Sequence, residues 1–331
     1  MTTSNFPSLL QRFFTDRLVA QLGASPHTIA SYRDTFRLVL RFAKATLKRA
    51  PSALRVDDLT VTFLGTFLDH LESTRHNTTR TRNNRLSALH AFFRYVAISE
   101  PSLGLHCQRI LAMPVKRYER RPVEFLTEAE CAALVAAPTL STWIGRRDRA
   151  LLLVAIQTGL RNSEITGLRQ EDVEMGTGAH VRCLGKGRKQ RCTPLRPDVV
   201  AVLRGWLAER RGKPTDPVFP SIRGGHLSAD ALQRLVSRHV VTARRACPSL
   251  AAKHVKPHTL RHAAAMALLQ RGVDLSVIAL WLGHESTETT QIYLHADMQL
   301  KERALAHTTA RHLPPARFRP SDPLLAFLEG L

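Results

Sequence analysis

A stretch rich in proline and glycine, residues 99–125, interrupts a chain that otherwise shows helical spacing of its apolar side chains. It reads SEPSLGLHCQRILAMPVKRYERRPVEF, and its second half is rich in Lys and Arg. Because proline and glycine end helices, this stretch separates two folding units, as a length of 331 residues allows. We expect a first domain over residues 1–110, a basic linker over 111–124, a second domain over 125–310 and a tail over 311–331.

The first hundred residues predict a small bundle of four helices, since apolar side chains recur there every three to four positions. The second helix begins at Ser25-Pro26, an N-cap followed by proline in the first turn. The fourth helix carries three arginines near its start, which form either a solvated face or a set of phosphate contacts. The candidate DNA contacts of the chain are Arg80, Arg82 and Arg85 on this helix and Lys116, Arg117, Arg120 and Arg121 in the linker.

The second domain also has a mainly helical pattern, with one β-hairpin. Thr127 and Glu130 have the spacing of a capping box, which starts a helix. The apolar segment RDRALLLVAIQTGL predicts a buried helix that ends at Gly159. Two short runs, residues 181–184 and 191–195, flank a Gly-Lys-Gly turn and predict the hairpin. The expected fold class is mainly α, with a small β-hairpin or sheet in the second domain.

The charge of the chain is its most unusual bulk property. Lys and Arg number 48 against 27 Asp and Glu, which gives +21 at pH 7 and a pI near 11.0. Such a field attracts a polyanion, and a DNA duplex is the obvious one. A membrane partner would require an amphipathic basic helix, a lipidation motif or a long apolar segment, and the longest apolar run, ALLLVAI, is too short to span a bilayer. We expect no membrane partner and a cytoplasmic protein that lies on the nucleoid when it is bound to DNA.

Two basic side chains of the second domain lie where the backbone leaves room for a ligand. Arg161 follows a glycine-ended helix at the start of another helix, and a guanidinium grips phosphate oxygens in a bidentate manner. Glu164, three residues on, either orients a neighbour or lies in solvent. Lys186 stands between two glycines at the hairpin tip, which allow close approach to a ligand. Taken singly, Arg161 also fits an ordinary surface arginine, and Lys186 a flexible basic turn.

Two histidine motifs follow further along the chain. HTLRH places His258 and Arg261 on one face at a helix start, a position that favours an anion. His258 and His262 also have the spacing of a metal pair, but the glutamate of H-E-x-x-H is missing and no nearby carboxylate supplies a third ligand. We therefore expect no metal, and a structural role for His262. His284 follows the glycine of WLGHES, and Tyr293 lies nine residues after it.

This ordered set of polar residues resembles the signature of one family. The chain is similar to the tyrosine recombinases, also called phage-type integrases, at Arg161, Lys186, His258, Arg261, His284 and Tyr293, with the acidic residue of the first arginine box at Glu164. The similarity covers roughly residues 126–310. The first domain, with SPHTIASYRDTFR, resembles the core-binding domain of the family, a looser signature. The resemblance implies a two-domain clamp around duplex DNA, with four protomers assembled on two sites.

The resemblance also implies strand exchange through a covalent intermediate. Tyr293 would attack phosphorus and form a 3′-phosphotyrosyl link. Arg161 and Arg261 would neutralise the non-bridging oxygens and the charge that develops in the transition state, and His284 would donate to the same oxygens.

Two proton transfers complete the implied reaction. The phenol, with an ordinary pKa of about 10, would give its proton to His258, and Lys186 would protonate the leaving 5′ oxygen. The energy of the phosphodiester is conserved, so neither ATP nor a divalent metal is required and we expect no cofactor. Two rounds, through a Holliday junction, would recombine double-stranded sites for a mobile element or for replicon resolution. Whether accessory proteins are needed stays open.

Three other functions share part of this evidence. A type IB topoisomerase uses the same tyrosine chemistry but rejoins the same strand, and the separate helical first domain favours a recombinase. A non-catalytic DNA-binding protein would share the charge but has no reason to keep every polar group named above. A metallohydrolase built on His258 and His262 lacks a third ligand.

The tail RHLPPARFRPSDPLLAFLEGL begins with prolines, which forbid a continuing helix. Asp322-Pro323 then predicts the start of a short apolar helix that would not be stable alone. It either folds back on its own domain or docks on a neighbouring protomer, as the family resemblance implies.

Overall fold

The structure is a computed structural model that describes residues 5–119, 123–185, 190–284 and 286–296. The chain divides near residue 120 into two compact units, which are described here one at a time. The expected class, mainly helical with a small sheet, is confirmed. No described helix is long and apolar enough to cross a membrane.

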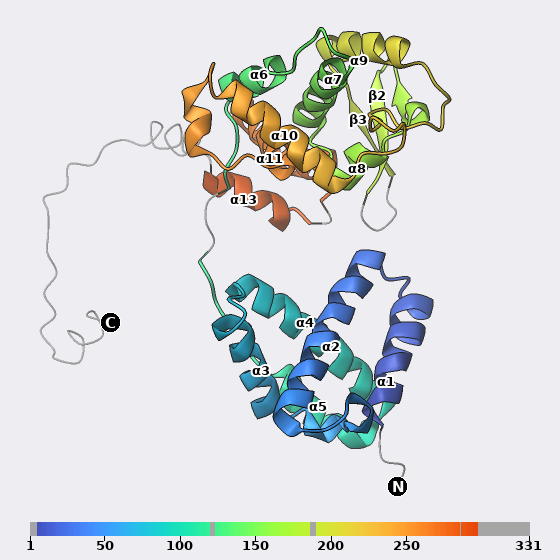
Figure 1. Ribbon diagram of the computed structural model, residues 1–331, viewed down its shortest axis with the longest axis vertical. Helices are drawn as coiled ribbons and strands as arrows, with labels where there is room; N and C mark the ends of the chain where they lie inside the picture. The colour runs from blue at the N-terminus through green and yellow to red at the C-terminus, as the bar shows by residue number, and fades with distance from the viewer. Residues whose placement is uncertain (1–4, 120–122, 186–189, 285, 297–331) are drawn as a thin grey trace, which may run out of the picture. The chain divides into compact units, whose positions relative to one another are not determined.

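The first unit is a helical bundle (Figure 1). Its helices are α1 (Phe6–Arg12), which continues as the π-helical segment η1 (Phe13–Gln21), α2 (Pro26–Leu47), α3 (Val61–Ser73), α4 (Thr79–Ser99) and α5 (Gly104–Leu111). Ser25 caps α2 as expected, because its hydroxyl accepts from the backbone N–H of Thr28. Phe92 of α4 forms the centre of the core, with edge-to-face contacts to Phe13 at 5.4 Å and to Phe36 at 5.2 Å.

Part of the proline- and glycine-rich stretch over residues 99–125 is helical. Helix α5 begins at Gly104 and buries Cys107 and Ile110 in the core of the first unit. Pro101 begins the short 3-10 helix Pro101–Leu103 that precedes α5, and Gly104 is the first residue of α5, so neither residue breaks it. Beyond α5, the side-chain amide of Asn83 pairs with the backbone of Lys116, donating to its carbonyl at 2.8 Å and accepting from its N–H at 3.1 Å. The chain therefore stays attached to α4 as far as Lys116.

The second unit surrounds a buried helix, α7 (Figure 1). Its helices are α6 (Glu128–Ala136), α7 (Trp143–Thr158), α8 (Asn162–Gly167), α9 (Pro197–Arg210), α10 (Ala229–Ala243), α11 (Pro257–Gln270), α12 (Leu275–Leu282) and α13 (Glu288–Ala296). The expected capping box of α6 is present, with reciprocal bonds between Thr127 and Glu130. Helix α7 ends at Gly159, which adopts the left-handed conformation expected of a glycine cap. Helix α9 was not expected from the sequence.

The sheet of the second unit is antiparallel, in the order β1–β2–β3. The strands are Val173–Glu174, His180–Leu184 and Gln190–Pro194, so the expected hairpin is β2 and β3, with Arg182 opposite Cys192. A third, short strand precedes it. In Figure 1 the sheet lies at one end of this unit, beside α8 and α9.

A buried charge cluster joins α7 to α10. Asp148 of α7 is fully buried, and its Oδ1 accepts from the guanidinium of Arg147 at 2.7 and 2.9 Å. Its Oδ2 accepts from Arg238 at 2.8 Å and lies 2.7 Å from Nε2 of His239, both on α10. Burial by itself would raise the pKa of Asp148, but the contacts with His239 and Arg147 outweigh it and hold that pKa below its ordinary value. The cluster fixes α7, the helix that leads into the candidate site.

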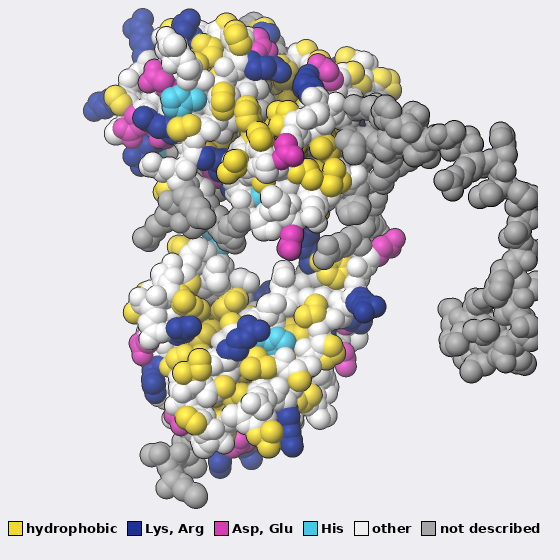
Figure 2. Space-filling model, turned by 180° about the vertical axis from the view of Figure 1, so that it is seen from behind, with side chains coloured by type: hydrophobic (Ala, Val, Ile, Leu, Met, Phe, Trp, Pro, Cys, Tyr) yellow, Lys and Arg dark blue, Asp and Glu magenta, His cyan; other side chains and the backbone are white. Residues whose placement is uncertain are grey.

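On the face shown in Figure 2, Lys and Arg side chains are spread over both units among hydrophobic and uncharged groups. The positive charge of the chain is therefore not gathered into one stripe on that face. Charge alone does not locate a site on that face.

Candidate active site

Glu164 on α8 joins two arginines from different elements. Its Oε1 accepts from Arg161 and from Arg191 of β3, each at 2.9 Å. Its Oε2 accepts from Nη2 of Arg191 and from the backbone N–H of Arg161, each at 2.7 Å. Burial by itself would raise the pKa of Glu164, but the bonds from the two arginines outweigh it and hold that pKa below its ordinary value. The carboxylate is thus ionised and fixes both guanidiniums.

Two arginines also grip the end of α12. Arg161 donates to the carbonyl of Gly283 at 2.6 Å, and Arg261 of α11 donates to the carbonyl of Leu282 at 2.7 Å. Arg261 also donates to the carbonyl of Gly159 at 2.7 Å. The last carbonyls of a helix carry a partial negative charge, which stabilises cations placed against them. Burial, followed by repulsion from Arg161, lowers the pKa of Arg261 to about 10, so it is still charged at neutral pH.

Two glycines in the left-handed conformation make this close packing possible. A Cβ on Gly159 would lie 2.8 Å from Cδ2 of Leu282, and a Cβ on Gly283 would lie 2.7 Å from Nη1 of Arg191. Both distances are too short for a side chain to fit without displacing its neighbour. Glycine is therefore required at both positions for conformation and for space.

His284 follows directly after the cap of α12. Its Nδ1 lies 2.8 Å from the hydroxyl of Thr290, a fully buried residue of α13. Burial, followed by repulsion from Arg261 and Arg161, lowers the pKa of His284 to about 4. The imidazole is therefore neutral at neutral pH and stands within the field of the same arginines.

Tyr293 is buried on α13, with an exposed fraction of 1%. It packs in a small core with Met266 and Leu269 of α11 and Leu282 of α12. Its hydroxyl lies 3.0 Å from Nδ1 of His262. Burial raises the pKa of Tyr293 to about 12, although nearby guanidiniums act in the opposite direction.

The structure thus brings together five of the residues that the sequence singled out. Arg161, Glu164, Arg261, His284 and Tyr293 come from α8, α11, the end of α12 and α13, and the arginines act electrostatically on both His284 and Tyr293. This arrangement would hold a phosphate between guanidiniums with a phenol beside it. Among the described residues, no group of three His, Cys, Asp or Glu side chains could hold a metal ion.

Three other residues bear on this site: Lys186 and His258, which were expected there, and Arg191, which was not. Lys186 lies outside the described residues. His258 is exposed at the start of α11, and its ring contacts that of His262 edge to face, with 4.6 Å between centroids. Arg191 was missed by the sequence analysis, because a single arginine in a β-strand has no local signal. Only the pairing of β2 with β3 brings it to Glu164.

Comparison with known proteins decides the family. A sequence model of the phage integrase family matches residues 124–300, and the SAM-like N-terminal domain of phage integrases matches residues 10–100. The chain belongs to the tyrosine recombinase, or phage integrase, family. Its enzyme class is that of the tyrosine-type site-specific DNA recombinases.

Curated relatives of this recombinase cover nearly its whole length. The putative integrase/recombinase y4rC of Sinorhizobium fredii is 53% identical over 323 residues, which are 98% of this chain and 97% of that protein. Tyrosine recombinase XerC of Pelobacter propionicus is 34% identical over 307 residues, 92% of this chain and 97% of that protein. Among solved structures, XerH recombinase bound to its palindromic difH substrate has a similar fold, with a TM-score of 0.69 and 24% identity over 86% of this chain and 81% of that chain.

Two of the three α4 arginines expected to contact DNA, Arg82 and Arg85, have partners inside the protein. Arg85 ties α4 to α2, donating to the carbonyl of Ser31 at 3.1 Å and to the hydroxyl of Thr35 at 3.0 Å. Arg82 donates to the carbonyl of Pro114 at 3.4 Å. These contacts give Arg82 and Arg85 a structural task, whether or not they also meet phosphate.

The other basic side chains that were predicted to contact DNA differ in their surroundings. Lys116 pairs with Glu72 at 2.9 Å. Arg80 and Arg117 are exposed. Arg120 and Arg121 lie outside the described residues. Contact with DNA remains a prediction for the whole set.

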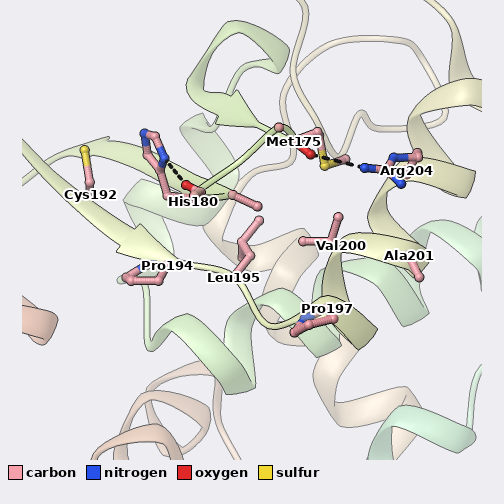
Figure 3. A pocket seen from close by; sticks show the side chains of 12 residues that line it. Met175, His180, Cys192, Pro194, Leu195, Pro197, Val200, Ala201 and Arg204 are labelled. Atoms are coloured by element: carbon pink, nitrogen blue, oxygen red, sulfur yellow. Dashed lines mark hydrogen bonds between the residues drawn. The ribbon is translucent and has the colours of Figure 1, made fainter.

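A separate hollow of about 730 Å³ lies between the sheet and α9 of the recombinase (Figure 3). Arg204 donates to the carbonyl of Met175 on one side of it, and His180 bonds to the carbonyl of Gly178 on the other. None of the residues expected at the active site lines this hollow. It is therefore distinct from the arginine cluster.

Proposed function

We propose that this chain cleaves and rejoins DNA strands at specific sites through a covalent link between Tyr293 and a 3′ phosphate. The observation that carries the proposal is the arrangement of Arg161 and Arg261. Both are held on protein carbonyls, and both act electrostatically on Tyr293. Groups fixed before the substrate arrives need little reorganisation during the reaction, which is how charge in a transition state is best stabilised.

The chemistry follows from these positions. Arg161 and Arg261 neutralise the non-bridging oxygens of the scissile phosphate, and neutral His284 donates a further hydrogen bond. Tyr293 attacks phosphorus, and Lys186 protonates the 5′ oxygen that leaves. His258, exposed at the N-terminus of α11, contacts the phosphate there or assists proton transfer. The 5′ hydroxyl of a partner strand then attacks the phosphotyrosyl link, and no cofactor or metal takes part.

The recombination event needs two such rounds. We propose that two double-stranded sites meet in a tetramer, that the strands pass through a Holliday junction and that the two units close around DNA as a clamp. We propose a core-binding domain over residues 1–110, a linker over 111–124, a catalytic domain over 125–310 and a tail over 311–331. We propose that this recombination takes place in the cytoplasm and serves a mobile element or replicon resolution, and the names of the relatives, a putative integrase/recombinase and a tyrosine recombinase, support the recombinase activity itself.

We further propose that residues 321–331, outside the described part of the chain, dock on a neighbouring protomer. A groove of about 770 Å³ between α6, α7 and α11 offers an apolar floor, and arginines 149, 196 and 271 stand on its lining. The segment SDPLLAFLEGL has apolar side chains that suit this floor and two acidic residues that can meet the arginines, two of which already pair with Glu128 or Asp198. Deleting residues 321–331 should spare binding of one protomer to a half-site and impair pairing and synapsis. A truncated protein that recombines like the full chain would remove the tail from assembly.

The proposed activity can be tested without knowing the target site. Wild-type protein and Tyr293→Phe are expressed in bacteria, and DNA covalently attached to protein is recovered under denaturing conditions and sequenced. We expect attached DNA for the wild type only, joined through its 3′ end to the peptide that contains Tyr293 and clustered at few sites. Adducts on another residue would refute the assignment. Adducts scattered over all DNA, together with relaxation of any supercoiled plasmid, would favour the topoisomerase instead.

A further inference from the structure

The hydroxyl of Tyr293 lies 3.0 Å from Nδ1 of His262, and the two rings meet edge to face with 5.6 Å between centroids. We infer that His262 receives the proton of Tyr293 when the phenol attacks DNA. The inference rests on the proposed function and adds a catalytic residue to it. From the sequence alone, His258 is the expected acceptor of this proton and His262 is expected to have a structural role.

Burial separates the roles of the two histidines. Tyr293 is 1% exposed, so water is a poor acceptor for its proton, whereas the imidazole of His262 already contacts the hydroxyl. His262 is half-buried on α11, one helical turn after His258, which is exposed. The exposed ring is the better placed of the two to meet a phosphate that comes from solvent. The half-buried ring serves the nucleophile.

The charges around His262 keep its imidazole free to accept a proton in the resting protein. Burial, followed by His258, Arg261 and His284, lowers its pKa to about 4, so its nitrogen is unprotonated at neutral pH. The scissile phosphate brings a negative charge to these same groups and makes the imidazole more basic in the complex. An imidazolium beside these cations is a strong acid, and the tyrosinate that leaves when the strand is rejoined is a strong base. The proton therefore returns readily to Tyr293 when the strand is rejoined.

The cleavage step conserves protons and electrons. The O–H bond of Tyr293 breaks, and its proton moves to Nδ1 of His262. The phenolic oxygen forms a bond to phosphorus while the bond from phosphorus to the 5′ oxygen breaks. The leaving oxygen takes a proton from Lys186, the acid of the proposed mechanism. Rejoining reverses every transfer, and no oxidant, reductant or further reactant is needed.

A substrate with sulfur at the 5′ bridging position isolates this step, because a thiolate leaves without a proton. We would measure single-turnover cleavage of such DNA between pH 6 and pH 9.5 by wild type, His262→Asn and His258→Asn, on a site recovered by the adduct experiment. Asparagine can hold the phenol by a hydrogen bond but cannot take its proton. We expect His262→Asn to cleave about 10²-fold more slowly at neutral pH, a typical effect of general base removal. Its rate should rise about tenfold per pH unit, as for a phenol that loses its proton to hydroxide.

His258→Asn provides the comparison. We expect it to cleave more slowly than wild type but with an unchanged pH profile. Difluorotyrosine at position 293, a more acidic phenol, should restore much of the rate of His262→Asn. DNA binding by each variant shows that it is folded. If His262→Asn does not fold, His262→Gly with added imidazole replaces it, and rescue that depends on the basicity of the imidazole derivative is then the expected result.

Two outcomes would overturn the inference. One is a His262→Asn protein that cleaves within threefold of wild type with the same pH profile, and the other is a His262→Gly protein that imidazole cannot rescue. In both cases wild type would still form the phosphotyrosyl adduct, so the proposed function would survive. Absence of that adduct from the wild type would instead remove the proposed function itself.

Discussion

The guanidinium of Arg191 on β3 donates two hydrogen bonds to the carboxylate of Glu164 on α8, at 2.9 and 2.7 Å. The same carboxylate receives Arg161, so a strand of the sheet positions the arginine that is expected to hold phosphate. The side chain of Arg191 is 11% exposed and that of Glu164 is 3% exposed. The pair therefore belongs to the class of buried ion pairs, in which removal of one partner leaves an uncompensated charge.

We predict that Arg191→Met lowers the stability of the second unit by about 3–5 kcal/mol and strongly reduces cleavage, since Glu164 and Arg161 lose a fixed position. The double variant Arg191→Met, Glu164→Gln should recover part of the stability but not the activity. Urea unfolding and a double-mutant cycle measure the coupling. Additive effects of the two substitutions would show that the pair does not act as a unit.

Gly283 and Gly272 make a matched pair for testing the packing against Arg191. Both have positive φ, 65° and 79°, so alanine strains the backbone at each by about 1 kcal/mol. At Gly283 the new Cβ also meets the guanidinium of Arg191, whereas nothing lies within 4 Å at Gly272. Gly272→Ala should cost only the strain and keep cleavage. Gly283→Ala should cost more stability and lose most cleavage, and equal behaviour of the two variants would contradict this.

Asp148 and Asp198 compare a buried with an exposed ion pair. Asp148 is fully buried, and Asp198 is 58% exposed beside Arg196. Asp148→Asn should lower the free energy of unfolding by about 3–5 kcal/mol, and Asp198→Asn by less than about 1 kcal/mol. The folded pKa of Asp148 is lowered, so its contribution is present above the ordinary value of 3.8 and is lost as pH falls through the folded pKa. Denaturant unfolding at pH 7 and at pH 3 measures both effects.

The two half-buried histidines predict a second loss of stability at low pH. Here the cause is that the folded chain disfavours the charged form of the group, whereas it favours the charged form of Asp148. His262 and His284 have a pKa of about 4 in the folded chain, against 6.5 as the ordinary value. The unfolded chain therefore binds their protons first, and stability should fall as pH drops from 6.5 towards 4, by on the order of 2 kcal/mol for each group. The unfolding midpoint should depend less on pH across this range in the double variant His262→Gln, His284→Gln than in the wild type. An unchanged slope would show that these histidines titrate normally.

Local signals explain what could be predicted from the sequence. Gly159 ends α7 and Thr127 caps α6, because each feature depends on residues close in the chain. Helix α5 was not predicted, since Pro101 and Gly104 count as helix breakers in a sequence, although Gly104 is the first residue of the helix and breaks nothing there. Arg191 and His262 depend on strand pairing and on the packing of α13 against α11. Neither relationship has a signature in a single sequence.

The burial of Tyr293 has a consequence for the host cell. A protein with a net charge of +21 adheres to any duplex and spends most of its time away from its target. With its phenol 1% exposed, it can do so without reacting. Random contact then leaves chromosomes intact, because a phenol packed against Met266, Leu269 and Leu282 does not meet a phosphate. A cell can therefore contain many copies of the enzyme without damage to its DNA, because the folded resting state is unreactive. Low expression is not needed for this protection.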